Sequence, residues 1–200
     1  MYVSYDNAPN EKEILKRIEN CRLTGGKVLD LSRLCMTELP EQVKGFEGLT
    51  ELDVSYNQLQ ALPDWIGTLP SLKKLNLRGH NIDALPDSTG ELKGLTFLDI
   101  GLNSFSEIPE CVKEFSSLEH LDLEYLQRFD PEYRRTETTS DWIGNFSKLE
   151  FLNLRHCGIK SLPESMKNLS NLRTLYLGAN KLSTLPEWLG DFRENKTRRS

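Results

Sequence analysis

The chain has 200 residues, a formal net charge of −5 and a hydrophobic fraction of 38%. An acidic chain lacks the basic surface that general nucleic-acid binding requires. A membrane span needs about 18 consecutive apolar residues, and the sequence has no such stretch. The N-terminus lacks the basic start and apolar run of a secretory signal. The four cysteines do not have metal-ligand spacings and are typical of a reducing compartment, so we expect a cytoplasmic protein.

Residues 1–25 are predicted to form an N-terminal segment with one capping helix. Asn10, with Glu13 three residues later, is typical of a helix start, and the two glycines after residue 24 end the helix. The residues expected on its apolar face are Ile14, Leu15, Ile18 and Cys21. The helix would cover the first open edge of a repeat array; a partner-binding helix is the alternative.

From residue 26 to residue 194 one apolar pattern occurs seven times. The clearest copy, residues 49–71, reads LTELDVSYNQLQALPDWIGTLPS. Successive copies start 23 residues apart, except that 31 residues separate Leu118 from Leu149. A period of this length indicates repeat units that stack into one elongated domain.

Each unit is predicted to contain a strand and a return segment. Polar and apolar residues alternate in its first half, as in residues 51–55, which predicts a short strand with one buried face. The second half starts with Leu-Pro and has apolar residues three positions apart, which favours a short helical or 3₁₀ turn. We therefore expect an α/β solenoid with parallel strands on its concave side and the turns on its convex side.

The ninth position of the pattern is asparagine in three units: Asn57, Asn103 and Asn180. Asparagine at this place can bond to backbone groups of the tight turn after the strand. The other four units have Leu34, His80, Leu126 and Cys157 there. We expect local irregularity or water at the two leucines, and a buried His80 with its hydrogen bonds satisfied.

This pattern resembles the leucine-rich repeat family. The Leu-Pro form of 23 residues is similar to the repeats of plant intracellular Ras-group proteins. Residues 18–31, IENCRLTGGKVLDL, resemble the start of bacterial leucine-rich arrays, including some attached to Roco GTPases. The resemblance implies a right-handed, horseshoe-shaped scaffold without enzymatic activity or cofactor, and it implies a protein partner, with a Ras-like GTPase as one candidate.

Eight extra residues interrupt the array after its fifth strand and predict an inserted loop at about residues 127–140. The segment is polar and charged, and it contains Phe129 and Tyr133. Insertions in repeat arrays become loops on one face, often a binding face. The alternative is a tolerated surface excursion, because long loops cost little entropy.

One outward column of the predicted strands consists mainly of acidic and amide residues: Asp30, Asp53, Asn76, Asp99, Asp122, Asn153 and Tyr176. It is either an acidic stripe for a basic partner or a solvated ladder that stabilises the strands. Because adjacent carboxylates repel, we expect nearby cations to share their charge: Lys74, Arg78, Arg155 and Arg173.

Aromatic and apolar residues are also predicted to face outward, and with the two loop aromatics they are our candidate partner-binding residues: Tyr56, Phe97, Leu102, His120, Tyr125, Phe151, His156 and Tyr176. Phe97 and Phe151 share one column with His120 between them. Aromatic residues surrounded by charge are typical of interface hot spots. The alternative is scattered surface residues without a role.

No catalytic, cofactor-binding or metal-binding pattern is present in the sequence. We therefore expect an interaction module, such as a scaffold or a regulator of a small GTPase or signalling pathway. One alternative is a bacterial effector that acts on a host partner. Another is a structural protein that self-associates through the C-terminal end of its repeat array. Residues 195–200 are predicted to form a basic tail after the array.

Overall fold

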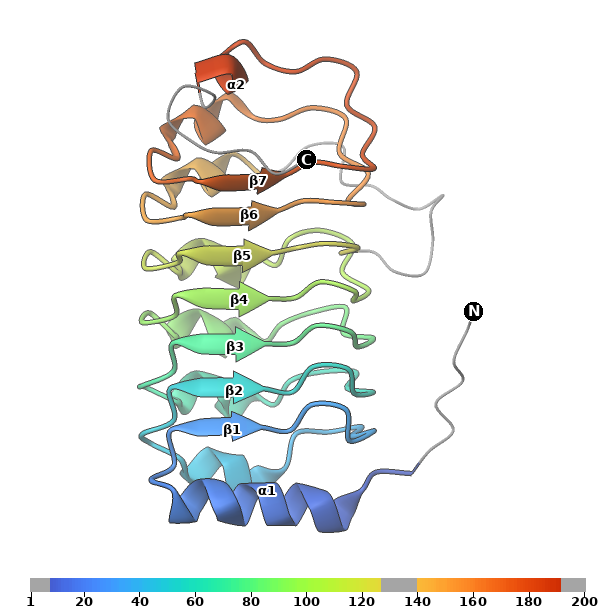
Figure 1. The fold of residues 1–200 in the computed structure, drawn as a ribbon, viewed down its shortest axis with the longest axis vertical. Coiled ribbons are helices and arrows are strands. Elements are labelled where there is room, and N and C mark those ends of the chain that lie inside the picture. Colours follow the sequence, from blue (N-terminus) through green and yellow to red (C-terminus); the bar gives the residue numbers. More distant parts are fainter. Residues whose placement is uncertain (1–7, 127–139, 192–200) are drawn as a thin grey trace.

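The computed structural model describes residues 8–126 and 140–191. Its strands form one parallel sheet in sequence order (Figure 1). They are β1 (Val28–Asp30), β2 (Glu51–Asp53), β3 (Lys74–Asn76), β4 (Phe97–Asp99), β5 (His120–Asp122), β6 (Phe151–Asn153) and β7 (Thr174–Tyr176). The predicted α/β solenoid is confirmed.

The register joins equivalent residues of successive units. Leu52 pairs with Leu75, and Leu75 pairs with Leu98. The longer step keeps the same register, since His120 on β5 pairs with Phe151 on β6. The eight extra residues therefore leave the strand ladder unchanged.

Short 3₁₀ turns return the chain behind the sheet (Figure 1). They are η1 (Glu41–Gly45), η2 (Asp64–Thr68), η3 (Asp87–Glu91), η4 (Glu110–Glu114), η5 (Asp141–Asn145) and η6 (Glu164–Asn168). A proline with extended ψ precedes five of them, and Ser140 precedes η5. Proline fixes φ and has no N–H to satisfy, which suits the first position of a turn.

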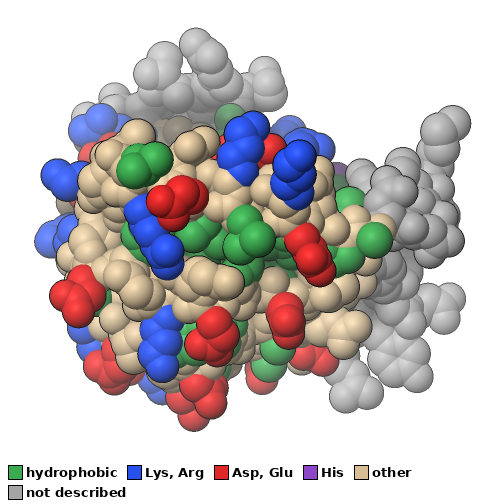
Figure 2. All heavy atoms as spheres, turned by 90° about the horizontal axis from the view of Figure 1, so that it is seen from below, with side chains coloured by type: hydrophobic (Ala, Val, Ile, Leu, Met, Phe, Trp, Pro, Cys, Tyr) green, Lys and Arg blue, Asp and Glu red, His purple; other side chains and the backbone are tan. Residues whose placement is uncertain are grey.

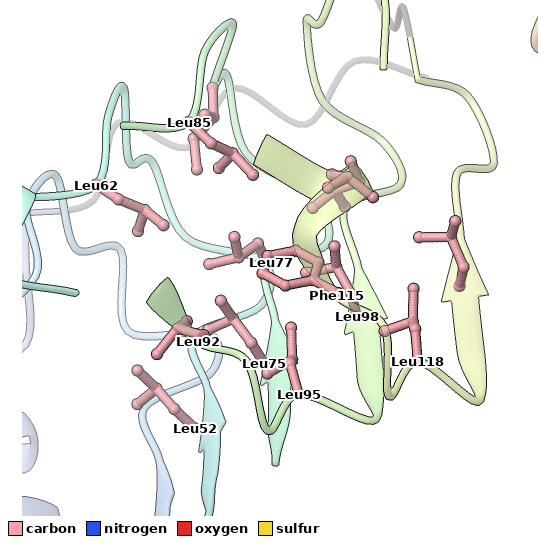
Figure 3. Packing of buried hydrophobic residues seen from close by; sticks show 14 of the residues in the cluster. Leu52, Leu62, Leu75, Leu77, Leu85, Leu92, Leu95, Leu98, Phe115 and Leu118 are labelled. Atoms are coloured by element: carbon pink, nitrogen blue, oxygen red, sulfur yellow. The ribbon is translucent and has the colours of Figure 1, made fainter. Parts of the chain in front are cut away.

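The core lies between the strands and the turns. Leu77, Leu98 and Phe115 lie together there and are fully buried (Figure 3). Each such side chain contributes about 1.5–3 kcal/mol when it leaves water. One unit supplies only one slice of this core, so the units must stack to bury it.

The predicted asparagine bonds are present. Asn103 is fully buried, accepts from the Ile82 N–H at 3.2 Å, and donates to the carbonyls of Leu77 at 2.7 Å and Ile100 at 3.0 Å. Asn57 makes the equivalent bonds, as does Asn180. These side chains therefore join each turn to the coil before it.

His80 takes the asparagine position in the third unit, but it is only partly satisfied. Its Nδ1 accepts from the Leu59 N–H at 3.3 Å. Its Nε2 is buried and reaches no acceptor with hydrogen-bond geometry among the described residues. The expectation of full satisfaction was wrong, because a rigid ring cannot reproduce the spread of an amide group. Burial lowers the pKa of His80 to about 4.

The two leucines at this position, Leu34 and Leu126, are buried without side-chain hydrogen bonds of their own. Next to Leu34, Cys35 has a φ of 57°, in the left-handed region that favours glycine. This is the irregularity expected in the first unit. Leu126 directly precedes residues outside the described part of the chain.

The helix α1 (Glu11–Leu23) lies at the β1 end of the sheet (Figure 1). Asn10 accepts from the Glu13 N–H at 3.2 Å, and Arg17 donates to the Asp30 carbonyl at 3.2 Å. Leu15 departs from the prediction, because it is 53% exposed. The buried residues are Ile14, Ile18 and Cys21, spaced i, i+4 and i+7, and Leu15 lies off this stripe. Viewed from this end, hydrophobic side chains are visible among the charged ones (Figure 2).

The β7 end is less covered. Leu175, Leu177 and Leu182 are only partly buried, and Leu185 is 58% exposed, whereas its equivalents Leu62 and Leu162 are buried. The short helix α2 (Trp188–Asp191) lies at this end (Figure 1), and Trp188 packs partly against the core. The last unit therefore leaves apolar surface of its core exposed.

Candidate functional site

The candidate site is the face of the sheet that points away from the core, called here the open face. It is formed by three columns of side chains. The first and third columns are the first and third residues of each strand, and the fifth column is the second residue after each strand. In the first column, these residues change along the sheet, from Val28 on β1 through Glu51 and Lys74 to the aromatic residues of β4–β6. The central leucines between the columns point inward and are the same in every unit.

Four aromatic side chains on β4–β7 form a continuous series, called here the aromatic ladder: Phe97, His120, Phe151 and Tyr176. Phe97 and His120 stack at 4.3 Å between ring centroids, and His120 and Phe151 stack at 4.0 Å. Phe151 meets Tyr176 edge to face at 5.6 Å. Strand register places the first three rings side by side, and burial between its neighbours lowers the pKa of His120. The neutral ring therefore continues an apolar surface.

The other predicted binding residues lie in the column of turns after the strands. Tyr125 stacks on His156 at 3.9 Å. Tyr56 lies under the Arg33 guanidinium, 4.2 Å from its ring centroid, and Leu102 precedes Tyr125 by one unit in this column. All of these turn residues except Arg33 were predicted, and all have positive φ. Non-glycine residues adopt this conformation at a cost of about 1–2 kcal/mol.

The structure thus divides the predicted patch. It brings Phe97, His120, Phe151 and Tyr176 into one series, and Tyr125 with His156 into a pair. Tyr56 is on the second unit, and Leu102 lies beside the turn of Tyr125, since its N–H donates to the Glu124 carbonyl at 2.7 Å. The remaining two candidates, Phe129 and Tyr133, and the predicted inserted loop lie outside the described residues.

The acidic column is a hydrogen-bonded ladder that is partly buried: Asn76 donates to Asp53 at 2.9 Å and Asn153 donates to Asp122 at 3.0 Å, while Asp30 at its start is exposed. Asp99 and Asp122 are buried. The Oδ1 of Asp99 accepts from the Gly101 N–H at 2.9 Å, and that of Asp122 accepts from the Glu124 N–H at 2.9 Å. Asp53, Asn76 and Asn153 make the same bond to the residue two positions on. These side chains hold the bend after each strand.

One cation is shared among three carboxylates of the open face. The Arg78 guanidinium lies 3.6 Å from Asp99, 3.5 Å from Asp122 and within hydrogen-bond distance of Glu124. Only 17% of the Arg78 side chain is exposed. Burial, together with the neighbouring Asp122, raises the pKa of Asp99 to about 7, although Arg78 and the Gly101 N–H act against this. The expectation that Arg78 shares its charge within the face is correct.

Glycine makes room for this arginine. A Cβ on Gly101 would meet the Arg78 Nη1 at 2.7 Å and the Glu124 carbonyl oxygen at 2.8 Å. The sequence interpretation missed Gly101 and Glu124. The fifth column itself gives the signal, because arginine, glycine and glutamate follow one another there at one-unit steps.

Among the described residues, the other expected cations do not pair with the acidic column. Lys74 pairs with Glu51 at 3.1 Å, and Arg173 pairs with Glu150 at 3.5 Å, away from the acidic column. Arg155 lies over the Tyr176 ring, 5.0 Å from its centroid. Within residues 8–126 and 140–191, no group of three or more His, Cys, Asp or Glu side chains has the geometry of a metal site. The open face offers aromatic contact area and fixed charge, which suits binding a polypeptide.

Comparison with protein families agrees with this architecture. Models of leucine-rich repeats match residues 47–90 and 147–190 in one form and residues 70–125 in another. The chain belongs to the leucine-rich repeat family. No curated protein sequence matches it.

Solved leucine-rich repeat structures resemble the chain along most of its length. A leucine-rich repeat protein of Leptospira interrogans is 26% identical, with a TM-score of 0.54 over 83% of this chain and 52% of its own. The ectodomain of the Arabidopsis thaliana receptor kinase GASSHO1/SCHENGEN3, in complex with Casparian strip integrity factor 2, is 29% identical, with a TM-score of 0.64 over 82% and 20%. The plant peptide hormone receptor RGFR1, in complex with RGF2, is 29% identical, with a TM-score of 0.59 over 75% and 24%.

The leucine-rich repeat chain described here spans about half or less of the length of these structures. None of its described helices is long and apolar enough to cross a membrane.

Proposed function

We propose that this leucine-rich repeat chain is a protein-interaction module that docks a polypeptide partner on its open face, with the aromatic ladder as the main contact. The observation that carries the proposal is the ladder itself. Three stacked rings and Tyr176 remain partly exposed on a sheet face whose other columns are polar. Two similar structures are a receptor kinase ectodomain in complex with Casparian strip integrity factor 2 and a peptide hormone receptor in complex with RGF2, which supports a polypeptide as the ligand.

The ladder has the properties of an interface hot spot. Its rings are fixed by stacking, so little side-chain entropy is lost when a partner covers them. Within the stack, His120 presents mainly its edge, because its faces contact Phe97 and Phe151. A partner side chain that covers these edges buries aromatic area, which dominates interface energetics.

The test is affinity capture from the cells that make the protein, with the wild type beside a Phe97→Ala/Phe151→Ala double variant. A partner bound through the ladder is lost from the double variant, with an affinity reduced by about 30-fold or more, as removal of hot-spot residues predicts. Val28→Ala is the matched control, because Val28 occupies the same column on β1 and is exposed. Equal capture by all three proteins would contradict the proposal.

The finer part of the proposal follows the resemblance to Ras-group proteins. In that case the partner is a small GTPase and the chain is a cytoplasmic scaffold or regulator. Four free cysteines fit a reducing compartment. Binding to the GTPase that is captured, measured in its GDP and GTP forms, tests this part. A captured partner from another class contradicts it.

A second candidate role is association through the β7 end. The partly exposed leucines there, and the edge of β7 that no other described strand pairs with, favour contact with a second molecule. Leu182→Glu/Leu185→Glu is expected to abolish a concentration-dependent increase in mass seen by sedimentation. A wild type that stays monomeric at all micromolar concentrations contradicts this role.

A further inference from the structure

The fifth column of the open face contains the same arrangement twice. Arg78 follows β3 and lies over Gly101 of the next unit, with its Nη1 2.7 Å from the position of a Cβ. Arg155 follows β6 and lies over Gly178 of the next unit, with its Nε 3.2 Å from the position of a Cβ. In both cases glycine lets the guanidinium lie along the sheet toward the β7 end.

The two arginines differ in what they meet. The Arg78 side chain is surrounded by Asp99, Asp122 and Glu124 and is largely buried. At the position equivalent to Asp99, Arg155 meets the neutral ring of Tyr176. No carboxylate of residues 8–126 and 140–191 lies within 4.0 Å of the Arg155 guanidinium, and the residue is exposed. Within the described residues, the second arrangement therefore has a tyrosine ring at the one anion position that can be compared, because the positions equivalent to Asp122 and Glu124 lie one unit beyond β7.

We propose that Arg155 binds an aspartate or glutamate side chain of the partner, next to the Tyr176 end of the aromatic ladder. This inference rests on the proposed function, because it assigns a chemical class to the partner segment that crosses the ladder. The partner combines an apolar or aromatic residue, which covers the ring edges, with an acidic residue, which reaches Arg155.

The geometry favours a carboxylate over other ligands. A guanidinium presents paired N–H donors that match the two oxygens of a carboxylate. The Tyr176 ring on one side and Gly178 beneath hold Arg155 in place before binding, which reduces the ordering cost. The intramolecular example, Arg78 with Glu124, shows that this fold brings an arginine of the fifth column into direct contact with a carboxylate.

Net charge alone would predict the opposite class of partner. The chain carries a formal charge of −5, which repels acidic segments at long range. An acidic preference that depends on one residue therefore indicates a local contact. A general electrostatic effect would instead favour basic segments and would respond equally to any arginine that is removed.

The probe is a library of random dodecapeptides displayed on phage, selected on wild type, Arg155→Gln and Arg33→Gln. Arg33 is a matched control, since it is exposed, lies over a tyrosine ring and makes no ion pair within the described residues. Displayed peptides are fused through their C-terminus, so any selected carboxylate comes from a side chain. Circular dichroism confirms that all the variants are folded.

The wild type and Arg33→Gln are expected to enrich peptides that combine acidic with apolar residues, whereas Arg155→Gln enriches peptides without the acidic preference. A synthetic, amidated lead peptide should lose about tenfold in affinity for the wild type when its acidic residue becomes the amide. The same change should not affect its affinity for Arg155→Gln. Equal acidic content in all selections, or no enriched peptide, overturns the proposal.

The double variant Phe97→Ala/Phe151→Ala separates this inference from the proposed function. If acidic peptides bind the double variant as tightly as the wild type, the ladder is not the docking surface and both the proposed function and this partner assignment fail. If peptides need the ladder but show no acidic preference, the proposed function stands and the role of Arg155 is wrong.

Discussion

The inward and outward sides of the sheet follow different rules. On the inward side, the central strand residue is leucine in every unit, and it is buried in all but the last. On the outward side, the first column runs through valine, glutamate, lysine, phenylalanine and histidine along β1–β5. Each inward residue must pack against the equivalent residues of the neighbouring coils. An outward residue contacts only the side chains beside it on the sheet and solvent. The difference indicates that stability resides mainly inside, and the outward side is the surface on which we propose binding.

The largest effect on stability is expected for the buried amide that joins two coils. Asn103→Ala leaves the Ile82 N–H and the carbonyls of Leu77 and Ile100 without their partner, so we expect a loss of about 3–5 kcal/mol in unfolding free energy. Urea denaturation measures it. Asn180→Ala, in the partly exposed last unit, should cost less. A loss below about 1 kcal/mol for Asn103→Ala would show that the inward turns tolerate unpaired backbone groups.

The next effect concerns the acid sensitivity of the inward side. The pKa of His80 is about 4 in the folded chain and 6.5 in the unfolded chain, so only the unfolded chain gains a proton between these values. Stability is therefore lost as pH falls through this range, by up to about 3 kcal/mol. His80→Asn should remove this loss. The urea midpoints of the wild type and His80→Asn at pH 7 and pH 4.5 measure this loss of stability. An equal decrease in both midpoints would contradict the prediction.

On the outward side, Asp99 should change the pH dependence of stability in the opposite direction. Its pKa is about 7 when folded, so the folded chain keeps a proton that the unfolded chain releases from about pH 4 upward. Stability therefore falls as pH rises from about 4 to 7, and Asp99→Asn should be about 1–3 kcal/mol more stable than the wild type at pH 8. The gain should disappear at pH 4. Thermal unfolding at both pH values tests this, and a destabilised variant at pH 8 would mean that the ion pair with Arg78 dominates.

The smallest expected change repairs an exception within the core. Thr89 is fully buried at a position that is otherwise Val43, Ile66, Val112, Ile143, Met166 or Leu189. Its hydroxyl has no hydrogen-bond partner among the described residues. Thr89→Val should stabilise the chain by about 1 kcal/mol, because it removes a buried unsatisfied group. Thr68→Val is the control, because the Thr68 hydroxyl donates to the Trp65 carbonyl at 2.7 Å; that variant should not gain stability.

Much of the fold and part of the candidate site were predictable from the sequence. The spacing of Leu52, Leu75 and Leu98 fixes both the strands and their register, so it also places Phe97 beside His120. The network of Arg78 was predictable only in part. Its cation and its anions occupy outward columns, but the depth at which they lie depends on the glycine of the neighbouring coil.

What the sequence by itself determined is the repeat: the strand and turn of each unit, the buried leucines, the asparagine bonds and the alignment of aromatic residues across strands. These follow from local spacing and from the need of each unit to cover the next. Only the tertiary structure decided that Asp99 and Asp122 are buried, that Leu15 is exposed, and that Arg78 is surrounded by carboxylates while Arg155 is not. These properties depend on how side chains of different coils fill the space between them, which a repeating pattern does not specify.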